Sequence, residues 1–354
     1  MTIYNCENCK ETFSHKKDYK SHTMHKNCKK SLTFIEVCAG AGGLSKGFID
    51  NGFKPILLNE IDKVCCDTLR LNHPEVKIHH GSMVSIDFEI ENEIDILMGG
   101  VPCQAFSQAG KRKGLEDKRG NLILNFINLV FKLKPKVFLI ENVKGLVSHN
   151  KGETLKFILN EIDKLELYTV SHKILNANDY NVPQKRERLF IIGVRKDINK
   201  KFKFPKPYEY KPILKDVLED CPKSEGLIYN EKKREIMELI PEGGCWIDLP
   251  IDIQKEYLGK SYNSGGGKRG IAKRLSMNKP SLTLLTTPSQ KQTERCHPIE
   301  TRPLQILEYS RIQTFPDNYK FCGTLSQRYK QIGNAVPVNL AKAISESIKK
   351  VLRN

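Results

Sequence analysis

The chain has 354 residues and a formal net charge of +17, with 58 Lys and Arg against 41 Asp and Glu. This length allows one large domain or two to three smaller ones, and the charge favours a polyanionic partner. No apolar run is long enough to span a bilayer, and the first residues lack the apolar centre of a secretory signal, so we expect a cytoplasmic protein. Eleven cysteines in such a chain favour catalytic or metal-binding thiols over disulfides.

The first 31 residues are Lys-rich and read as a separate module. Their spacing is similar to that of a ββα zinc finger. The predicted zinc ligands are Cys6, Cys9, His22 and Cys28, with His25 as the alternative fourth ligand. A segment this small buries too little surface to fold well alone, so bound zinc would supply the missing stability. The alternative is a basic tail whose cysteines occur by chance.

Residues 32–198 alternate apolar, β-rich runs with amphipathic runs. Strands are predicted over residues 33–37, 55–60, 95–100 and 137–142. Helices are predicted over residues 44–51, 64–71 and 122–133. This alternation is typical of an α/β fold in which helices cover both faces of a parallel sheet.

The alternation breaks after Arg195, where Lys-, Pro- and Gly-containing sequence begins. We expect residues 199–298 to form a second, smaller lobe, mostly irregular or β. Helical patterning returns in residues 299–354, which we expect to complete the first domain. The last helix is predicted to place Leu340, Ile344 and Ile348 on one buried stripe.

A run of small residues follows the first predicted strand: Ala39, Gly40, Ala41, Gly42 and Gly43. Small residues at a strand-to-helix turn let a nucleotide-like ligand approach the backbone and the helix N-terminus. Glu60 ends the next strand, 20 residues after Gly40. Nucleotide-binding folds use an acid at this spacing to hold ribose hydroxyls. These features alone also fit a nicotinamide-dependent oxidoreductase.

Two later strand ends carry candidate chemical groups. Cys103, in the loop Pro102-Cys103-Gln104, follows one apolar strand, and Glu141 with Asn142 ends another. Open α/β sheets bind ligands at the carboxyl ends of their strands, so these positions predict an active site with a thiol nucleophile and an acid. The alternatives are a small buried cysteine and a solvated loop carboxylate.

The order of the motifs resembles that of the cytosine-5 DNA methyltransferase family. The matching stretches are FIEVCAGAGG, NEID, GGVPCQAFS, DKRGNL, ENV, LNANDYNVPQKRERLF, RPLQILEYSRIQTFP and QIGNAVP. The resemblance implies a Rossmann-like fold that binds S-adenosylmethionine. It implies these catalytic residues: Cys103, Glu141, Arg186 and Arg188. It implies these cofactor contacts: Cys38, Ala39, Gly40, Ala41, Gly42, Gly43, Leu44, Glu60, Ile61, Ser82, Met83, Pro102, Asn334, Ala335 and Val336.

The chemistry of the family suits these residues, because C5 of cytosine is too weak a nucleophile to accept a methyl group directly. The resemblance implies that the Cys103 thiolate adds at C6 and that Glu141 hydrogen-bonds N3. Arg188, with Arg186 nearby, is assigned to the cytosine O2 and a neighbouring phosphate. Neither target atom is reachable within a stacked duplex, so the base must flip out of the helix.

Two positions depart from the usual family pattern. Cys38 stands where Phe is common, and Ser82 stands where Asp is common. The first removes an aromatic contact and the second leaves a hydroxyl or the backbone to recognise adenine. We therefore expect weaker binding of S-adenosylmethionine, but not its loss.

The resemblance predicts a monomer that acts on double-stranded DNA, with residues 199–298 recognising the target. It also predicts the protective half of a restriction-modification system, paired with a restriction endonuclease. One alternative is an RNA cytosine-5 methyltransferase acting on transfer RNA, and another is a catalytically silent zinc-finger DNA-binding protein. The oxidoreductase alternative leaves the Pro102-Cys103-Gln104 loop unexplained.

Overall fold

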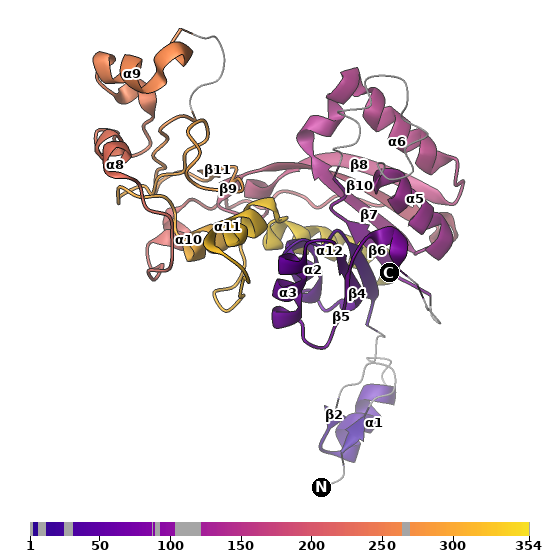
Figure 1. Ribbon diagram of the computed structural model, residues 1–354. Coiled ribbons are helices and arrows are strands. Elements are labelled where there is room, and N and C mark those ends of the chain that lie inside the picture. Colours follow the sequence, from indigo (N-terminus) through magenta and orange to yellow (C-terminus); the bar gives the residue numbers. More distant parts are fainter. Residues whose placement is uncertain are drawn as a thin grey trace.

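The computed structural model describes residues 3–5, 12–24, 31–86, 88, 93–102, 122–263 and 270–353. In this part of the chain a seven-stranded sheet, in the order β5-β4-β3-β6-β7-β10-β8, carries helices on its faces (Figure 1). Its strands are β3 (Thr33–Val37), β4 (Lys54–Glu60), β5 (Lys77–His80), β6 (Ile96–Gly99), β7 (Val137–Val143), β8 (Tyr168–Asn176) and β10 (Glu187–Arg195). The predicted α/β architecture is therefore confirmed.

The sequence predicts a parallel sheet, but the sheet is only partly parallel. β3, β4, β5, β6 and β7 pair in parallel, but β10 runs antiparallel to both of its neighbours, β7 and β8. Residues 177–186, between β8 and β10, hold a 3-10 turn (Ala177–Tyr180) and the two-residue strand β9 (Gln184–Lys185). A parallel return needs a long crossover, usually a helix, so this short connection brings the chain back antiparallel.

Four helices fall where the sequence predicts them: α2 (Gly43–Ile49), α3 (Lys63–Asn72), α5 (Leu122–Leu133) and α12 (Val338–Arg353). Helix α6 (Glu153–Asp163) was not predicted. Leu340, Ile344 and Ile348 of α12 are fully buried, as predicted. α12 packs closely on α2, because Gly47 has no side chain: a Cβ there would lie 2.5 Å from the Ala341 Cβ.

The strand order reverses between β3 and β6. From β3 the chain moves outward to β4 and β5, and it then returns to the other side of β3 to form β6 and β7. Loops that leave two such strands at their carboxyl ends diverge, so a crevice opens between them. The loop after β3 begins at Cys38 and the loop after β6 begins at Gly100. The fold therefore places the starts of the two most distinctive loops of the sequence at one crevice.

Residues 215–263 and 270–298 form a second lobe beside the sheet domain (Figure 1), whereas the chain just before them packs on the core of the sheet domain through Phe202, Phe204 and Tyr208. The helices of the lobe are α7 (Lys215–Leu218), α8 (Glu231–Glu238) and α9 (Ile251–Leu258), and its one described strand is β11 (Ser281–Leu282). Most of the described residues of this lobe are irregular, and its regular structure is mainly helical rather than β. Local signals favour helices: the Asn230 side chain caps α8 by accepting from the Lys233 N–H.

The second lobe has its own apolar core, which explains why it is separate from the sheet. This core draws on the helices and the chain that follows them: Tyr229, Met237, Ile240, Leu249, Leu258, Ile271, Ala272 and Cys296. The lobe is joined to the sheet domain where β11 pairs in parallel with β9.

The N-terminal segment contains β1 (Tyr4–Asn5), β2 (Thr12–Phe13) and α1 (Lys16–Met24), with the two strands antiparallel. The rings of Tyr4 and Tyr19 stack with centroids 5.8 Å apart. The predicted ligands Cys6, Cys9, Cys28 and His25, and the side chain of His22, lie outside the described residues. Among the residues that are described, no His, Cys, Asp and Glu side chains gather in a group able to hold a metal ion. The same part of the chain holds no helix long and apolar enough to cross a membrane.

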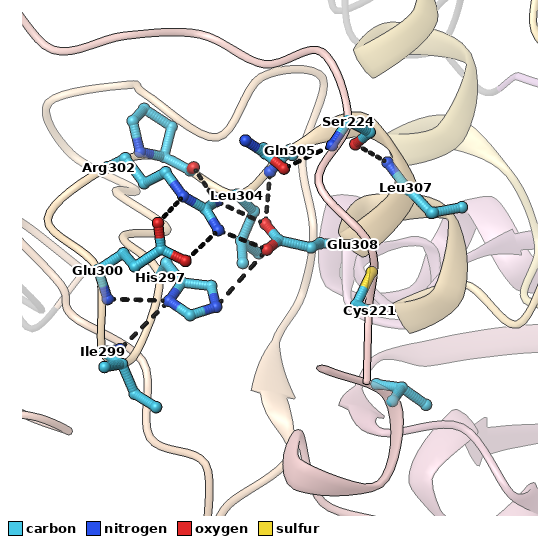
Figure 2. Close-up of polar contacts among 12 residues, drawn as sticks. Cys221, Ser224, His297, Ile299, Glu300, Arg302, Leu304, Gln305, Leu307 and Glu308 are labelled. Atoms are coloured by element: carbon cyan, nitrogen blue, oxygen red, sulfur yellow. Dashed lines mark hydrogen bonds and ion pairs between the residues drawn. The ribbon is translucent and has the colours of Figure 1, made fainter. Parts of the chain in front are cut away.

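A buried ion pair joins the end of the second lobe to helix α10 (Ile306–Ile312), as Figure 2 shows. The Arg302 guanidinium donates to both Glu308 oxygens, at 2.8 and 2.7 Å, and to both Glu300 oxygens, at 3.0 Å each. His297 Nδ1 accepts the backbone N–H of Glu300 at 3.0 Å, so the ring proton lies on Nε2, 3.5 Å from Glu308. Burial lowers the pKa of His297, which keeps the ring neutral.

The two carboxylates that bind Arg302 differ in exposure, and this difference predicts their contributions to stability. The Glu308 side chain is 5% exposed, whereas that of Glu300 is 49% exposed. Removing one partner of a buried pair strands the other charge, so Glu308→Gln should lower the free energy of unfolding by about 3 kcal/mol. The matched change Glu300→Gln should lower it by less than about 1 kcal/mol. Urea denaturation measures both, and equal effects would contradict this account.

Candidate active site

A cavity of about 1030 Å³ lies at the carboxyl ends of β3, β4, β6 and β7. Twelve of the predicted cofactor contacts line it: Cys38, Ala39, Gly40, Ala41, Gly43, Leu44, Glu60, Ile61, Pro102, Asn334, Ala335 and Val336. Three predicted catalytic residues also line it: Glu141, Arg186 and Arg188. Residues from distant parts of the sequence therefore converge on one cavity large enough for a nucleotide-sized ligand.

Three predicted cofactor contacts do not line the cavity. The Ser82 hydroxyl accepts the Val84 N–H at 3.3 Å and so caps a 3-10 turn (Met83–Ser85) instead. Met83 is buried in the apolar core. Gly42 is required by packing, because a Cβ there would lie 2.7 Å from the Tyr319 hydroxyl. Turn capping explains Ser82, and packing explains Met83 and Gly42, which a motif match does not reveal.

The turn after β3 is open toward a ligand at Gly40. Gly40 has a left-handed backbone with φ of 56°, and a Cβ there would meet no atom within 4 Å. Cys38 also has a positive φ, of 52°, and burial raises the pKa of its thiol to about 12, so the thiol stays neutral. Gly43, by contrast, packs tightly: its Cβ would lie 2.2 Å from the Val336 carbonyl oxygen.

The Glu60 carboxylate is fixed by three backbone N–H groups. Oε2 accepts from Gly40 at 2.7 Å, and Oε1 accepts from Ile61 at 2.8 Å and from Asp62 at 3.0 Å. These bonds link the end of β4 to the turn after β3 and orient the carboxylate. Ile61, next to it, is 70% exposed at the cavity, which is unusual for a large apolar side chain.

Glu36 is a cavity residue that the sequence analysis missed. It lies in β3, is 1% exposed, and its Oε2 has no hydrogen-bond partner within the described residues. Burial raises its pKa to about 8, helped by the charges of Glu60 and Glu141 and opposed by hydrogen bonds from Ser45. An acid within the otherwise apolar run FIEV was the signal that could have revealed it.

Glu141 and Arg188 form an ion pair inside the cavity. Arg188 Nε lies 3.0 Å from Glu141 Oε1, and the two side chains are 13% and 12% exposed. Burial raises the pKa of Glu141, although Arg188 and Arg186 act against the rise. At a given pH, a larger fraction of Glu141 is therefore protonated than of an exposed glutamate.

The nucleophile predicted from the sequence, Cys103, lies outside the described residues, but the strand end that leads into it is fixed. Asn142 Nδ2 donates to the Val101 carbonyl at 2.8 Å. A Cβ added at Gly100 would lie 3.3 Å from Glu141 Oε2, so the carboxyl sits directly against the start of this loop. Pro102, the residue before Cys103, lines the cavity.

Arg186 differs from Arg188 in what it contacts. It is 2% exposed, and its Nη atoms donate to the carbonyls of Leu284 at 3.0 Å, Gly333 at 2.9 Å and Asn334 at 3.4 Å. Burial lowers its pKa to about 9, which still leaves it protonated at neutral pH. These donors are engaged by the protein itself, so the geometry favours a positioning role over contact with a substrate.

Further residues line the cavity that the sequence did not predict as site residues. They are Asp62, Val64, Cys65, His149, Leu284, Leu285, Thr286, Gln290, Gln327, Lys330 and Gln331. Most belong to α3, to the end of the second lobe or to α11 (Leu325–Asn334). Asp62 and Gln331 lie within the motifs NEID and QIGNAVP. No local pattern marks the others, because only tertiary packing brings them to the sheet edge.

The fold and cavity define an α/β enzyme that binds a nucleotide-like cofactor beside a buried acid and guanidinium pair. The chain belongs to the C-5 cytosine-specific DNA methylase family, whose sequence model matches residues 32–350. It is thus a DNA (cytosine-5)-methyltransferase, which uses S-adenosylmethionine as methyl donor. The family resemblance is confirmed, and the oxidoreductase alternative is excluded.

Several relatives are Type II methyltransferases. The chain is 51% identical to M.Sau96I of Staphylococcus aureus, over 90% of this chain and 76% of that protein. It is 50% identical to M.PspPI of Psychrobacter, over 91% and 80%, and 35% identical to M.HhaI of Haemophilus parahaemolyticus, over 90% and 94%.

Solved structures share the fold. A crystal structure described as a DNA modification methyltransferase encoded within an E. coli prophage superposes with a TM-score of 0.68 at 26% identity, covering 92% of this chain and all of that one. A variant of Spodoptera frugiperda DNMT2 superposes with a TM-score of 0.62 at 20% identity, covering 91% of this chain and all of that one.

Proposed function

We propose that the chain methylates cytosine within one double-stranded DNA sequence and protects that sequence from a cognate restriction endonuclease. The observation that carries the proposal is the Glu141–Arg188 pair, at 3.0 Å, beside the strand end that leads into Cys103. The relatives at about half identity are Type II methyltransferases, which supports the restriction-modification role.

The cavity residues fit S-adenosylmethionine, which supplies the methyl group when bound. The oriented Glu60 carboxylate would accept hydrogen bonds from ribose hydroxyls, and exposed Ile61 would cover the adenine. The open backbone at Gly40 would allow the methionine end to approach. Glu36, with its buried and unpartnered Oε2, would receive the methionine ammonium.

The chain's own residues would handle the cytosine. The Cys103 thiolate would add to C6, while Glu141 would donate a proton toward N3 and so stabilise the charge that develops on addition. Arg188 would hold Glu141 in place and donate to the cytosine O2. Once C5 carries the methyl group, a base would take the C5 proton, the C6–S bond would break and the N3 proton would return to Glu141, which restores the thiolate and the aromatic ring.

We propose a role for each part of the chain from its family motifs, its apolar core and its order of strands and helices. Residues 32–198 and 299–354 would form the catalytic domain, residues 199–298 would recognise the target, and residues 1–31 would form a zinc finger. The separate core of the second lobe supports the second assignment. The strand, strand and helix order of residues 4–24 supports the third.

The central prediction concerns Cys103. Bisulfite sequencing of DNA from cells that express the chain should show methylated cytosine in one short sequence. Cys103→Ser should abolish methylation, because a hydroxyl is a far weaker nucleophile than a thiolate. A target duplex carrying 5-fluorocytosine should trap a covalent complex with the wild type only. Methylation of transfer RNA alone, or an active Cys103→Ser variant, would overturn the proposal.

The second prediction concerns Glu36 and pH. Its pKa of about 8 keeps it mostly protonated at pH 7, and an adjacent ammonium would favour the charged form. Binding of S-adenosylmethionine should therefore release a proton, and affinity should rise with pH until about pH 8 and then level off. Calorimetry in buffers of different ionisation enthalpy counts the protons.

Two comparisons make this measurement specific. Glu36→Gln should bind S-adenosylmethionine about tenfold or more weakly and release no proton. Methylthioadenosine, which lacks the ammonium, should bind the wild type without releasing a proton. Equal proton release by the wild type and Glu36→Gln would assign the titration to another group.

The third prediction concerns the N-terminal module. If Cys6, Cys9, His22 and Cys28 bind zinc, metal analysis of the purified protein should find about one zinc per chain. Cys6→Ala should remove it, whereas Cys221→Ala, at a cysteine of the second lobe, should not. Zinc-free wild-type protein would identify the segment as a basic tail.

A further inference from the structure

Two walls of the cavity touch each other through their backbones. One wall is the recognition segment (residues 284–286), at the end of the second lobe, and the other is the cofactor turn (residues 332–336), at the end of α11. A Cβ on Gly333 would lie 1.9 Å from the Leu285 carbonyl oxygen, so only glycine allows this approach. Gly333 lies in the last turn of α11, whose final carbonyls have no following helical turn to accept from and so need other donors.

Side chains from the β9 region hold both backbone groups of Leu284. Its N–H donates to Gln184 Oε1 at 2.9 Å, and its carbonyl accepts from Arg186 Nη1 at 3.0 Å. Gln184 is 0% exposed. The recognition segment is therefore fixed by two buried side chains that lie two residues apart in the sequence.

The same side chains reach the cofactor turn. Gln184 Nε2 donates to Gln313 Oε1 at 2.9 Å, and Gln313 Nε2 donates to the carbonyls of Ile332 at 2.7 Å and Ala335 at 3.1 Å. Arg186 Nη2 donates to the Gly333 carbonyl at 2.9 Å. A continuous chain of buried hydrogen bonds thus runs from the recognition segment to the cofactor turn.

Helix α10 ties this chain to the other end of the second lobe. Gln313 is the residue that ends α10, and Glu308, near its start, binds Arg302 and His297 (Figure 2). The lobe is therefore attached to α10 at two places. One is the recognition segment, which Gln184 connects to Gln313, and the other is His297, which contacts Glu308.

Buried polar groups must keep their partners, so these segments have little freedom to move separately. A shift of the cofactor turn would leave the Gln313 amide unsatisfied, and a rotated Gln313 would break its bond with Gln184. If Gln184 then moved, the Leu284 N–H would lose its acceptor, Gln184 Oε1. Order in one wall consequently favours order in the other.

We propose that Gln184 and Gln313 form a positioning relay through which binding of the cofactor and binding of DNA strengthen each other. The proposal rests on the proposed function, because it assigns the cofactor to the turn and the DNA to the second lobe. Linkage requires the effect to be reciprocal: the factor by which cofactor raises DNA affinity equals the factor by which DNA raises cofactor affinity.

The test measures the affinity of the full-length protein for its target duplex with and without saturating S-adenosylhomocysteine. We expect the product to tighten DNA binding by about fivefold or more in the wild type. Gln313→Met keeps a side chain of similar size but cannot donate to Ile332 or Ala335, so the tightening should fall toward one. The double variant Gln184→Met/Gln313→Met should lose no more coupling than either single variant, because both changes break one relay.

Asn178→Leu is the matched control. Asn178 is 5% exposed, and its Nδ2 donates to the carbonyls of Val182 and Pro212, at 2.9 Å each, away from the cavity. This variant should lose stability, as measured by thermal unfolding, yet keep the wild-type coupling factor. If Asn178→Leu loses coupling as Gln313→Met does, general loosening explains the effect and the relay is wrong.

Two further results separate the relay from the proposed function. A wild type that methylates DNA but shows no coupling, or a Gln313→Met variant that keeps full coupling, overturns the relay alone. A wild type that neither binds S-adenosylmethionine nor methylates DNA overturns the proposed function.

Discussion

The requirement that buried backbone groups be hydrogen-bonded shapes the cavity more than any other constraint. The recognition segment and the end of α11 are buried against each other where neither a sheet ladder nor a further helical turn satisfies their carbonyls, so side chains must do so. Arg186 and Gln313 donate to these carbonyls, Gln184 accepts the Leu284 N–H, and Gly333 permits the close contact. The carbonyl acceptors compensate the two Nη groups of Arg186 for lost water, whereas its Nε has no partner within the described residues.

Three of the four carboxylates that line the cavity in the described part of the chain are held in different ways. Backbone N–H groups fix Glu60, and a guanidinium pairs with Glu141. Glu36 has hydrogen bonds from Ser45 but leaves one oxygen unsatisfied in a buried place. A cavity of this kind suits a cationic ligand, because a bound cation would stabilise the one carboxylate that the protein itself leaves incomplete.

Two arginines of one motif illustrate why sequence similarity does not assign roles within a site. Arg186 and Arg188 lie two residues apart and look equivalent in the sequence. In the folded chain, Arg186 donates to three backbone carbonyls, whereas Arg188 pairs with Glu141 at the cavity. Burial and available acceptors make the distinction, and the carbonyls that Arg186 binds lie 98 to 148 residues away in the sequence.

The sequence by itself determined the alternating strands and helices, the Gly-rich turn, Glu60 and the strand-end position of Glu141, because periodicity and strand ends are local properties. Only the tertiary structure decided that β10 runs antiparallel, that the few regular elements of the second lobe are mainly helices, that Ser82 and Met83 stay away from the cavity, and that Glu36 lines it. These features depend on which distant backbone groups and charges become neighbours when the chain packs. A residue's own sequence context contains no record of those neighbours.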